Sequence, residues 1–527
     1  MRPLHAAVTL AALLLPAAPG LAADTPVKSR IVGVDLFKNG LAIVKREATL
    51  GKTGTYTIDD VPQPVYGTFW IDSTTSVDAM LRMRDTEVPV SEAPPAHLQD
   101  DLAGKKVTVF FKGEKRAPAT GTVVKFKPPK GEEGAAGRFL VLQTAKGRAY
   151  IEPSEVSTVE AEEAGDTVTR RRPQLVLALG ETDKPETKVT IRYIAHGISW
   201  APSYRIDISD PKTLLLEQHA VIRNELADLT GAEVRLISGY PSVEYAHVRS
   251  PLSPRTSWAT FFGELASYRG REINVLGNSI VAQQAVSLNG RPGDGWGAVP
   301  LALGATPAGE GVDLHYQSIG KRTLADGDTL SLTVAKGKSG YERIVEWLAP
   351  DTRDAFGHPQ DRDAQDEVWD ALKFKNPLSF PMTTGPAAVT ANGLFNGQRT
   401  THWVNSGEET LLRVEKALSV RTRAVENERL VRDGSARDLT WVGGRQYRKV
   451  VVEGELVASN NRKEQIKLLV RRRFSGELVS ADADPKQTLR EEGVYSVNKR
   501  QELVWALDLK GGEEKKLKYV YTVQIPQ

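Results

Sequence analysis

The sequence predicts a mainly β protein of several β-sandwich or barrel domains, with few short helices. Two features support this prediction. The chain has 45 glycines and 30 prolines among 527 residues, a proportion that suits many turns better than long helices. Its apolar residues alternate with polar ones along many short segments, which is typical of strands with one buried face. About three or four domains are expected at this length.

The composition also excludes several functional classes. With 69 Lys and Arg against 66 Asp and Glu, the chain is close to neutral, so we expect no nucleic-acid partner. It has no cysteine, which excludes disulfides, thiolate metal sites and cysteine nucleophiles. We therefore expect the fold to be stabilised by burial alone.

Residues 1–23 have the pattern of a secretory signal peptide. Arg2 supplies a positive start, Ala6–Leu15 is a short apolar run, and small residues follow it. This run is too short to cross a bilayer, which needs about 20 apolar residues. We expect cleavage near Ala22 or Ala23 and export to the periplasm or the cell surface. No later stretch is long and apolar enough to predict a transmembrane anchor.

Residues 24–98 are predicted to form an N-terminal β domain. The segments IVGVDLFK and LAIVKREATL flank the pair Asn39-Gly40. Asn-Gly is a preferred pair for a type I′ turn, in which both residues take positive φ. The sequence therefore predicts a hairpin here, followed by a linker at SEAPPAHLQDD.

Residues 99–165 are predicted to form a small SH3-like β-barrel. Five short β segments fit this interpretation: KKVTVFFK, ATGTVVKFK, RFLVLQT, GRAYIEP and VSTVE. A single turn at Pro153-Ser154-Glu155 is expected before the last of them. Such a domain either binds a peptide or serves as a spacer.

Residues 166–380 are predicted to form a central β domain with a loose insertion at about 248–311. Strand-like segments run from QLVLALG to AEVRLISG and resume at LSLTVAK. The insertion has seven glycines between Gly290 and Gly311. A loop of this length in a compact domain is either functional or disordered.

One segment of the insertion has helical spacing and an aromatic face. Ser257 is a candidate N-cap, and Gly270 is a candidate C-terminal stop. The partner-binding candidates lie between them at positions i, i+3, i+4 and i+7: Trp258, Phe261, Phe262 and Leu265. Three interpretations stay open: the face docks on the protein's own sheet, it binds a partner or a membrane surface, or the segment is idle and disordered.

Residues 381–527 are predicted to form a C-terminal Ig-like β-sandwich that ends in a hairpin. Apolar residues alternate along its last two segments: Leu503, Trp505, Leu507 and Leu509, then Leu517, Tyr519, Tyr521, Val523 and Ile525. This alternation implies one buried and one solvated face. We expect Trp505 in the core and Glu502 on the solvated face, where Glu502→Lys should matter little.

No motif specifies a catalytic, cofactor or metal site, and none is predicted. The histidines after the signal segment are too far apart in the chain for a short zinc spacing. Asp361, Asp363 and Asp366 resemble the start of a calcium loop but lack its glycine and its last glutamate. Ser209–Lys212 and Lys52–Gly54 match the SxxK and KTG motifs of penicillin-recognising enzymes in reversed order, which we interpret as chance.

Two arginine triplets occur, Arg170–Arg172 and Arg471–Arg473. The second lies in a predicted strand, where alternate arginines face opposite sides. We interpret these arginines as solvated edge residues rather than as a phosphate site.

Several segments together resemble a known bacterial family. They are Trp200-Ala-Pro202-Ser-Tyr204, the stretch AVIRNELADLTGAEVRLISGYP with Asn224 and Asp228, NGLFNGQ at Asn392–Gln398, and the closing WALDLKGGEEKKLKYVYTV. In this order they resemble exported β-rich proteins of unknown function that are often labelled mucoidy inhibitor A-like.

The resemblance covers roughly residues 30–95 and 173–527. Many members have Asp-Trp where this chain has Asp228-Leu229, and a long helical hairpin where residues 100–160 predict a barrel. The family implies an exported β-rich protein and supplies no catalytic residues to carry over.

These observations favour an exported, non-catalytic envelope protein that binds a protein or polysaccharide partner. One alternative is a carbohydrate-active hydrolase with two carboxylates, since a carboxylate pair from distant strands leaves no sequence spacing. Another is a mechanical spacer made of a string of domains.

Overall fold

The structure is a computed structural model that describes residues 24–526. It omits 90–97, 114–115, 127–138, 163–166, 240, 242, 255, 268–313, 350, 355–356, 360–366, 430–438, 443 and 492–496. The predicted signal peptide, most of the insertion, Gly270 and the Asp361–Asp366 loop therefore lie outside the described residues. Most of the described residues lie in strands, and the helices among them are α1 (Leu98–Asp101) and α2 (Trp258–Ser267). The mainly β prediction is confirmed.

The chain divides into two compact units. The first comprises Met1–Ile31, Lys45–Ile194 and Val248–Tyr268, and the second comprises Val32–Val44, Ala195–His247 and Arg269–Gln527. These units rest on spatial contacts, whereas the five predicted ranges rest on changes in composition along the sequence. The predicted ranges stay a prediction.

The first unit contains a four-stranded sheet and a short strand pair. The sheet order is β1 (Thr25–Pro26), β4 (Gly54–Ile58), β12 (Thr167–Leu179) and β6 (Val77–Pro89). Strand β12 pairs antiparallel with β6 along its whole length, from Leu179 opposite Val77 to Thr167 opposite Pro89. Strand β5 (Trp70–Asp72) pairs with β13 (Thr187–His196).

A five-stranded sheet lies between β6 and β12 in the sequence, and its strands coincide with the five predicted segments. Its spatial order is β10 (Gly147–Ile151), β9 (Leu140–Thr144), β8 (Ala119–Val123), β7 (Lys106–Phe111) and β11 (Val156–Ala161). A 3₁₀ turn at Pro153–Glu155 precedes β11, as predicted. Six buried aliphatic residues make its core: Val107, Val109, Val123, Leu140, Leu142 and Ile151. Membership of the SH3-like class stays a prediction.

The predicted hairpin between β2 (Arg30–Leu36) and β3 (Leu41–Leu50) is present, but its predicted turn type is wrong. Gly40 has a φ of 85°, whereas Asn39 does not take positive φ. Phe37 N donates to Leu41 O at 3.0 Å, and three residues, 38–40, lie between this hydrogen-bonded pair. Asn39 is the middle one of the three and not one of two central residues. Its side-chain Oδ1 instead accepts from Leu41 N at 3.3 Å.

The two-residue Asn-Gly turn occurs elsewhere, between β20 (Gly385–Ala391) and β21 (Leu394–Thr401). Asn392 and Gly393 have φ values of 50° and 77°, and Ala391 lies opposite Leu394 in the register. Positive φ at both central residues is the requirement of a type I′ hairpin turn.

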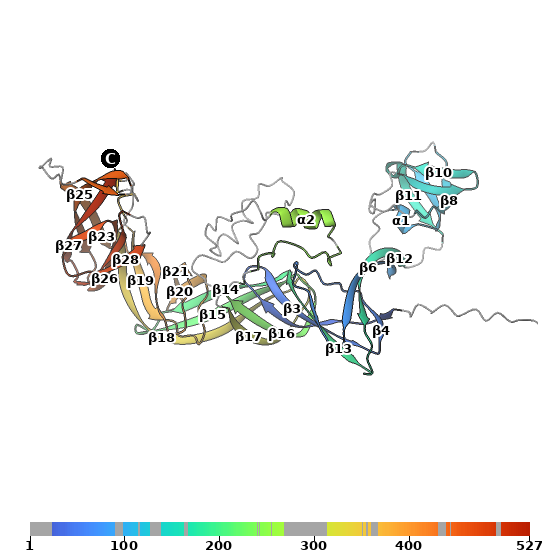
Figure 1. The fold of residues 1–527 in the computed structure, drawn as a ribbon, viewed down its shortest axis with the longest axis horizontal. Helices are drawn as coiled ribbons and strands as arrows, with labels where there is room; N and C mark the ends of the chain where they lie inside the picture. Colours follow the sequence, from blue (N-terminus) through green and yellow to red (C-terminus); the bar gives the residue numbers. More distant parts are fainter. Residues whose placement is uncertain are drawn as a thin grey trace, which may run out of the picture. The chain divides into compact units, whose positions relative to one another are not determined.

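The second unit is built around β18 (Thr329–Ala349), a strand of 21 residues (Figure 1). Its first part pairs with β15 (Thr213–Asn224), and its last part pairs with β19 (Glu367–Lys375) and, in parallel, with β26 (Ile466–Ser475). The sheet order is β21, β20, β14 (Ile198–Asp207), β15, β18, β26, β29 (Arg500–Leu509) and β28 (Lys486–Glu491), with β22 (Glu409–Lys416) beside β19.

Segments far apart in the sequence meet in this unit. Strand β16 (Leu229–Ser238) pairs in parallel with β2 and antiparallel with β17 (His315–Leu324). Asp35 accepts two hydrogen bonds of 2.6 Å from Arg235. The buried Lys38 ammonium donates to Thr383 Oγ1, 345 residues away.

A second sheet faces the C-terminal end of the long one across an apolar core. Its order is β23 (Val420–Arg429), β25 (Arg445–Asn460), β30 (Glu514–Pro526) and β27 (Glu477–Ala481), with β24 (Leu439–Val442) beside β25 (Figure 1). The largest fully buried side chains of this core include Trp347, Trp505, Tyr519 and Tyr521. The two sheets give this region sandwich character, and its Ig-like class stays a prediction.

The last two strands confirm the predicted alternation but do not form the predicted hairpin. Strand β29 pairs with β26 and β28, whereas β30 pairs with β25 and β27 in the other sheet. Both strands direct their apolar face into the one core, so the turn at Lys510–Glu513 connects the two sheets. Alternation identifies the buried face of each strand but not its pairing partner.

Candidate functional site

The aromatic helix forms as predicted, and its first turn is capped. Helix α2 begins at Trp258, and Ser257 Oγ accepts from Thr260 N at 3.1 Å. Phe261 is buried with its ring edge against Tyr66, at 4.9 Å between ring centroids. Phe261 therefore packs helix α2 against Tyr66 within the first unit.

The other predicted partner-binding residues are not buried by this contact. Trp258 and Phe262 are 65% and 60% exposed, and their rings stack at 5.6 Å. Leu265 is half-buried. The structure thus brings three of the four residues into one aromatic group with one member buried, and a partner-binding role for them stays a prediction.

A polar recess lies on the face of the long sheet that is turned away from the sandwich core. We call it the arginine cleft. It has a volume of about 450 Å³ and is lined by Glu346, Arg399, Thr400, His402, Leu411, Leu412, Arg413, Arg471 and Arg473. These residues come from β18, β21, β22 and β26 and from the segment that follows β21.

The second arginine triplet supplies two of these residues. Alternation along β26 sends Arg471 and Arg473 into the cleft and Arg472 into the core, where its side chain is fully buried. The interpretation of the triplet as solvated edge residues is wrong, because β26 is an interior strand between β18 and β29. The predicted alternation of its side chains is confirmed.

A buried carboxylate lies at the base of the cleft. Glu346 is 3% exposed. Its Oε2 accepts from Arg413 Nε at 2.7 Å, and its Oε1 lies 2.9 Å from Arg471 Nε. A buried carboxylate without a partner would be strongly unfavourable. The two arginines supply the compensating charge, and both contact Glu346 through Nε.

A second buried carboxylate holds the neighbouring arginine. Glu502 is 6% exposed and accepts from Arg473 Nε at 3.0 Å and from Arg471 Nη1 at 3.5 Å. The expected solvation of Glu502 is therefore wrong, and this removes the reason for expecting Glu502→Lys to matter little. Glu502 lies on the outer face of the sheet as predicted, but the arginines of β26 cover it.

Arg399 reaches the cleft from a different strand. Its Cζ lies 4.5 Å above the ring of Trp369, and its Nε donates to Val414 O at 3.3 Å. Gly397, two residues earlier, lets β21 approach β22 closely, since a Cβ there would lie 3.0 Å from Val414 O. A guanidinium stacked on an indole is held by cation–π attraction while its polar edge stays accessible.

A larger groove adjoins the cleft and shares Leu411 and Arg471 with it. Its volume is about 700 Å³. Apolar side chains form part of its lining: Ile344, Leu411, Leu468, Leu469, Val504, Ala506 and Leu507. Two ion pairs border it, Lys467 with Glu342 and Lys373 with Glu409. The cleft and the groove are therefore neighbours on the sheet face, and we refer to the two together as the recess.

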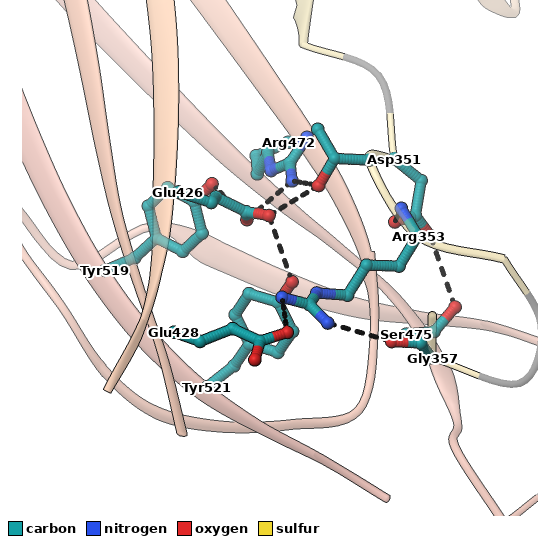
Figure 2. Close-up of polar contacts among 10 residues, drawn as sticks. Asp351, Arg353, Gly357, Glu426, Glu428, Arg472, Ser475, Tyr519 and Tyr521 are labelled. Carbon is teal, nitrogen blue, oxygen red and sulfur yellow. Dashed lines mark hydrogen bonds and ion pairs between the residues drawn. The ribbon is translucent and has the colours of Figure 1, made fainter. Parts of the chain in front are cut away.

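A separate buried cluster lies inside the sandwich on the other side of β26 (Figure 2). Glu426 is its centre. It accepts from Arg472 Nη2 at 2.6 Å, from Tyr519 OH at 2.7 Å and from Tyr521 OH at 3.2 Å. Thr352 Oγ1 donates to the same carboxylate.

Two further groups extend this cluster. Asp351 Oδ2 accepts from Ser475 Oγ at 3.2 Å. Arg353 donates to Gly357 O at 2.8 Å and to Glu428 at 3.0 Å (Figure 2). Side chains from both sheets and from the segment after β18 thus meet around two buried arginines, which links the sheets across the core.

The environment separates the pKa values of the two central carboxyl groups. Burial opposes the ionisation of Glu426, but the charge of Arg472 and the hydroxyl donors outweigh it and lower its pKa. Burial raises the pKa of Asp351, against the opposing effects of the Arg353 N–H and Arg472. Burial also raises the pKa of Tyr519 and Tyr521 far above the ordinary value, so both phenols remain hydrogen-bond donors.

Ser209, the first residue of the SxxK match, has a structural role. It lies between β14 and β15 and donates through Oγ to Asp207 Oδ1 at 2.5 Å. Within the part of the chain that the structure describes, no three His, Asp or Glu side chains gather in a group able to hold a metal ion.

No protein-family model matches this chain, nor does any curated protein sequence. The resemblance to mucoidy inhibitor A-like proteins therefore stays a prediction. Among the helices of the described residues, none has the length and apolar character needed to cross a bilayer.

Sequence reasoning missed the arginine cleft as a site. Glu346 and Glu502 are 156 positions apart in the sequence, yet both contact Arg471. Only the pairing of distant strands brings these charged groups together. The usable signal was the spacing of Arg471 and Arg473, which places them on one face of a strand.

Proposed function

We propose that this chain is an exported, non-catalytic envelope protein that binds a polysaccharide partner in the arginine cleft and the adjoining groove. The observation that carries the proposal is that the cleft, of about 450 Å³, and the groove, of about 700 Å³, are neighbours on the sheet face with Leu411 and Arg471 in both linings. A linear chain of sugars needs such an elongated recess, with donors and acceptors along its sides for its hydroxyl groups.

The lining favours a polysaccharide over a protein partner. The cores of protein interfaces are depleted in charge and rich in aromatic residues. The recess has the opposite composition: ion pairs border it, and the described residues that line it include no Trp, Tyr or Phe. Its apolar part consists of aliphatic side chains that can pack against the faces of sugar rings.

The test is binding of the full chain to a panel of polysaccharides by affinity gel electrophoresis. Ala506→Trp would place a large side chain in the groove without removing a charge, because Ala506 is exposed there. Val479→Trp is the matched control, since Val479 is 62% exposed in β27, outside the recess. We expect Ala506→Trp alone to weaken binding. Equal loss in both variants, or binding of no polysaccharide, would contradict the proposal.

A hydrolase with a carboxylate pair is the second candidate, and the Asp351–Glu426 cluster is the observation that favours it. Opposite pKa shifts of two neighbouring carboxyl groups are the pattern of a general acid and its partner. Both groups are occupied by internal donors, however, and neither lines the cleft or the groove. Release of reducing ends from a bound polysaccharide, lost in Asp351→Asn, would establish this function instead.

A further inference from the structure

We infer that the polysaccharide is acidic and that the arginine cleft binds its anionic group, a carboxylate, phosphate or sulfate. This inference rests on the proposed function and specifies its ligand. It is carried by the four arginines whose side chains line the cleft, because most of their terminal nitrogens make no hydrogen bond to the protein's own carboxylates.

The inner contacts of the arginines are all accounted for. Arg413, Arg471 and Arg473 are held by Glu346 and Glu502 through Nε, with one further contact from Arg471 Nη1 to Glu502. Arg399 is held by Trp369 and by a backbone carbonyl. Each guanidinium is therefore fixed in orientation before any ligand arrives.

The outer nitrogens remain available. Among the described residues, no hydrogen bond uses either terminal nitrogen of Arg399 or Arg473, or Nη2 of Arg413 or Arg471. Within the same residues, Glu367 is the further carboxylate in contact; it lies 3.7 Å from Arg413 Nη1 and is half exposed. The four guanidinium groups thus outnumber the carboxylates that contact them, and the cleft keeps a positive charge.

Arginine suits this task better than lysine would. Its planar fork donates two parallel hydrogen bonds to an oxyanion, and a guanidinium is more weakly hydrated than an ammonium. Because the cleft arginines are already oriented, little side-chain freedom is lost when the anion binds.

The groove has a different charge balance, which orients the ligand. Its Lys467 and Lys373 are paired with Glu342 and Glu409, and its Lys486 is matched in number by Asp508, so the groove adds little net charge. The anionic group therefore belongs in the cleft, and the neutral part of the adjoining sugars belongs in the groove.

The test uses polygalacturonate, its methyl ester and dextran as probes, with binding measured at low and high salt. The methyl ester keeps the sugar backbone and removes the charge. We expect the full chain to bind polygalacturonate, to bind the ester and dextran at least tenfold more weakly, and to lose affinity as salt rises. Dextran sulfate and a phosphomannan then show which oxyanion binds best; preference for any of the three supports the inference.

Arg399→Gln is the variant of choice, since Arg399 is exposed on β21 and bonds to no buried carboxylate. We expect binding of polygalacturonate about ten- to hundredfold weaker, the effect of losing a charge-assisted hydrogen-bond pair. Arg399→Lys should bind polygalacturonate more tightly than Arg399→Gln but more weakly than the wild type, because lysine keeps the charge but lacks the planar fork. Arg421→Gln, an exposed arginine of β23 outside the cleft, is the control and should bind normally. Thermal melting of each variant confirms that it is folded.

The outcomes separate the two proposals. Equal binding of polygalacturonate, ester and dextran, unchanged in Arg399→Gln, would overturn the acidic ligand and leave polysaccharide binding intact. Binding of none of the probes would overturn the proposed function itself. Binding of polyglutamate as tight as that of polygalacturonate would assign the cleft to an acidic protein and overturn both.

Discussion

Replacement of Arg472 by methionine should destabilise the sandwich by about 3 kcal/mol at pH 7. The variant leaves the Glu426 carboxylate buried with three hydroxyl donors and no cation bonded to it. Breaking a buried ion pair from one side costs about 3–5 kcal/mol. The lower end applies because Nε and Nη1 of Arg472 have no hydrogen-bond partner, and removing such buried donors offsets part of the loss.

The pH dependence has a definite sign. In the wild type the pKa of Glu426 is lowered below its ordinary value of 4.5, so its stabilisation is present above that value and is lost as pH falls through the folded-state pKa. Without Arg472, burial dominates and the folded-state pKa is raised. The destabilisation at neutral pH then decreases on acidification, and the difference between variant and wild type should shrink toward about pH 4.

Hydrogen exchange of peptides from β25, β26 and β30 measures the opening free energy of this core directly. The double variant with Arg472→Met and Glu426→Gln should be more stable than Arg472→Met alone, because the buried charge is gone. An Arg472→Met protein as protected as the wild type at pH 7 would refute the reasoning. A loss that grows on acidification would refute it as well.

Three further predictions concern stability. Trp505→Ala should cost about 3–5 kcal/mol, since the side chain is 1% exposed in the sandwich core; an unchanged denaturation midpoint would contradict its place there. Glu502→Lys should lower the melting temperature, because it places a third cation beside Arg471 and Arg473. Glu502→Gln should lower the melting temperature less. Phe261→Ala should cost about 3 kcal/mol or more, whereas the exposed Phe262→Ala should stay within about 0.5 kcal/mol, as compared by urea denaturation.

The sequence predicted those features of the fold that depend on neighbouring residues. Alternation located the buried faces of β29 and β30, and the five segments of the small sheet coincide with its strands. The helix at Trp258–Ser267 follows from its spacing and from its Ser257 cap. Each of these features is set by a period of two or 3.6 residues and by turn chemistry within the same segment.

Pairing between distant strands could not be predicted in the same way. Nothing local distinguishes a β29–β30 hairpin from two strands in facing sheets, because both arrangements bury the same residues. The choice depends on β25 and β26, which compete for these edges. The cleft shares this origin, since Arg399 and Arg473 meet only through the order of strands in the sheet.

The long-range pairings of the second unit also set the order in which the protein can fold during synthesis. Lys38 finds its partner Thr383 only after most of the chain has been made, and β2 has to wait for β16. The sandwich core is closed by β30, the last strand of the described chain, which pairs with β25 on one side and β27 on the other. A nascent chain emerging from the ribosome therefore keeps the apolar face of this sandwich core uncovered until β30 has been made. Pairing between strands so far apart in the sequence is slow to form, and chaperones have a long interval in which to bind the uncovered strands.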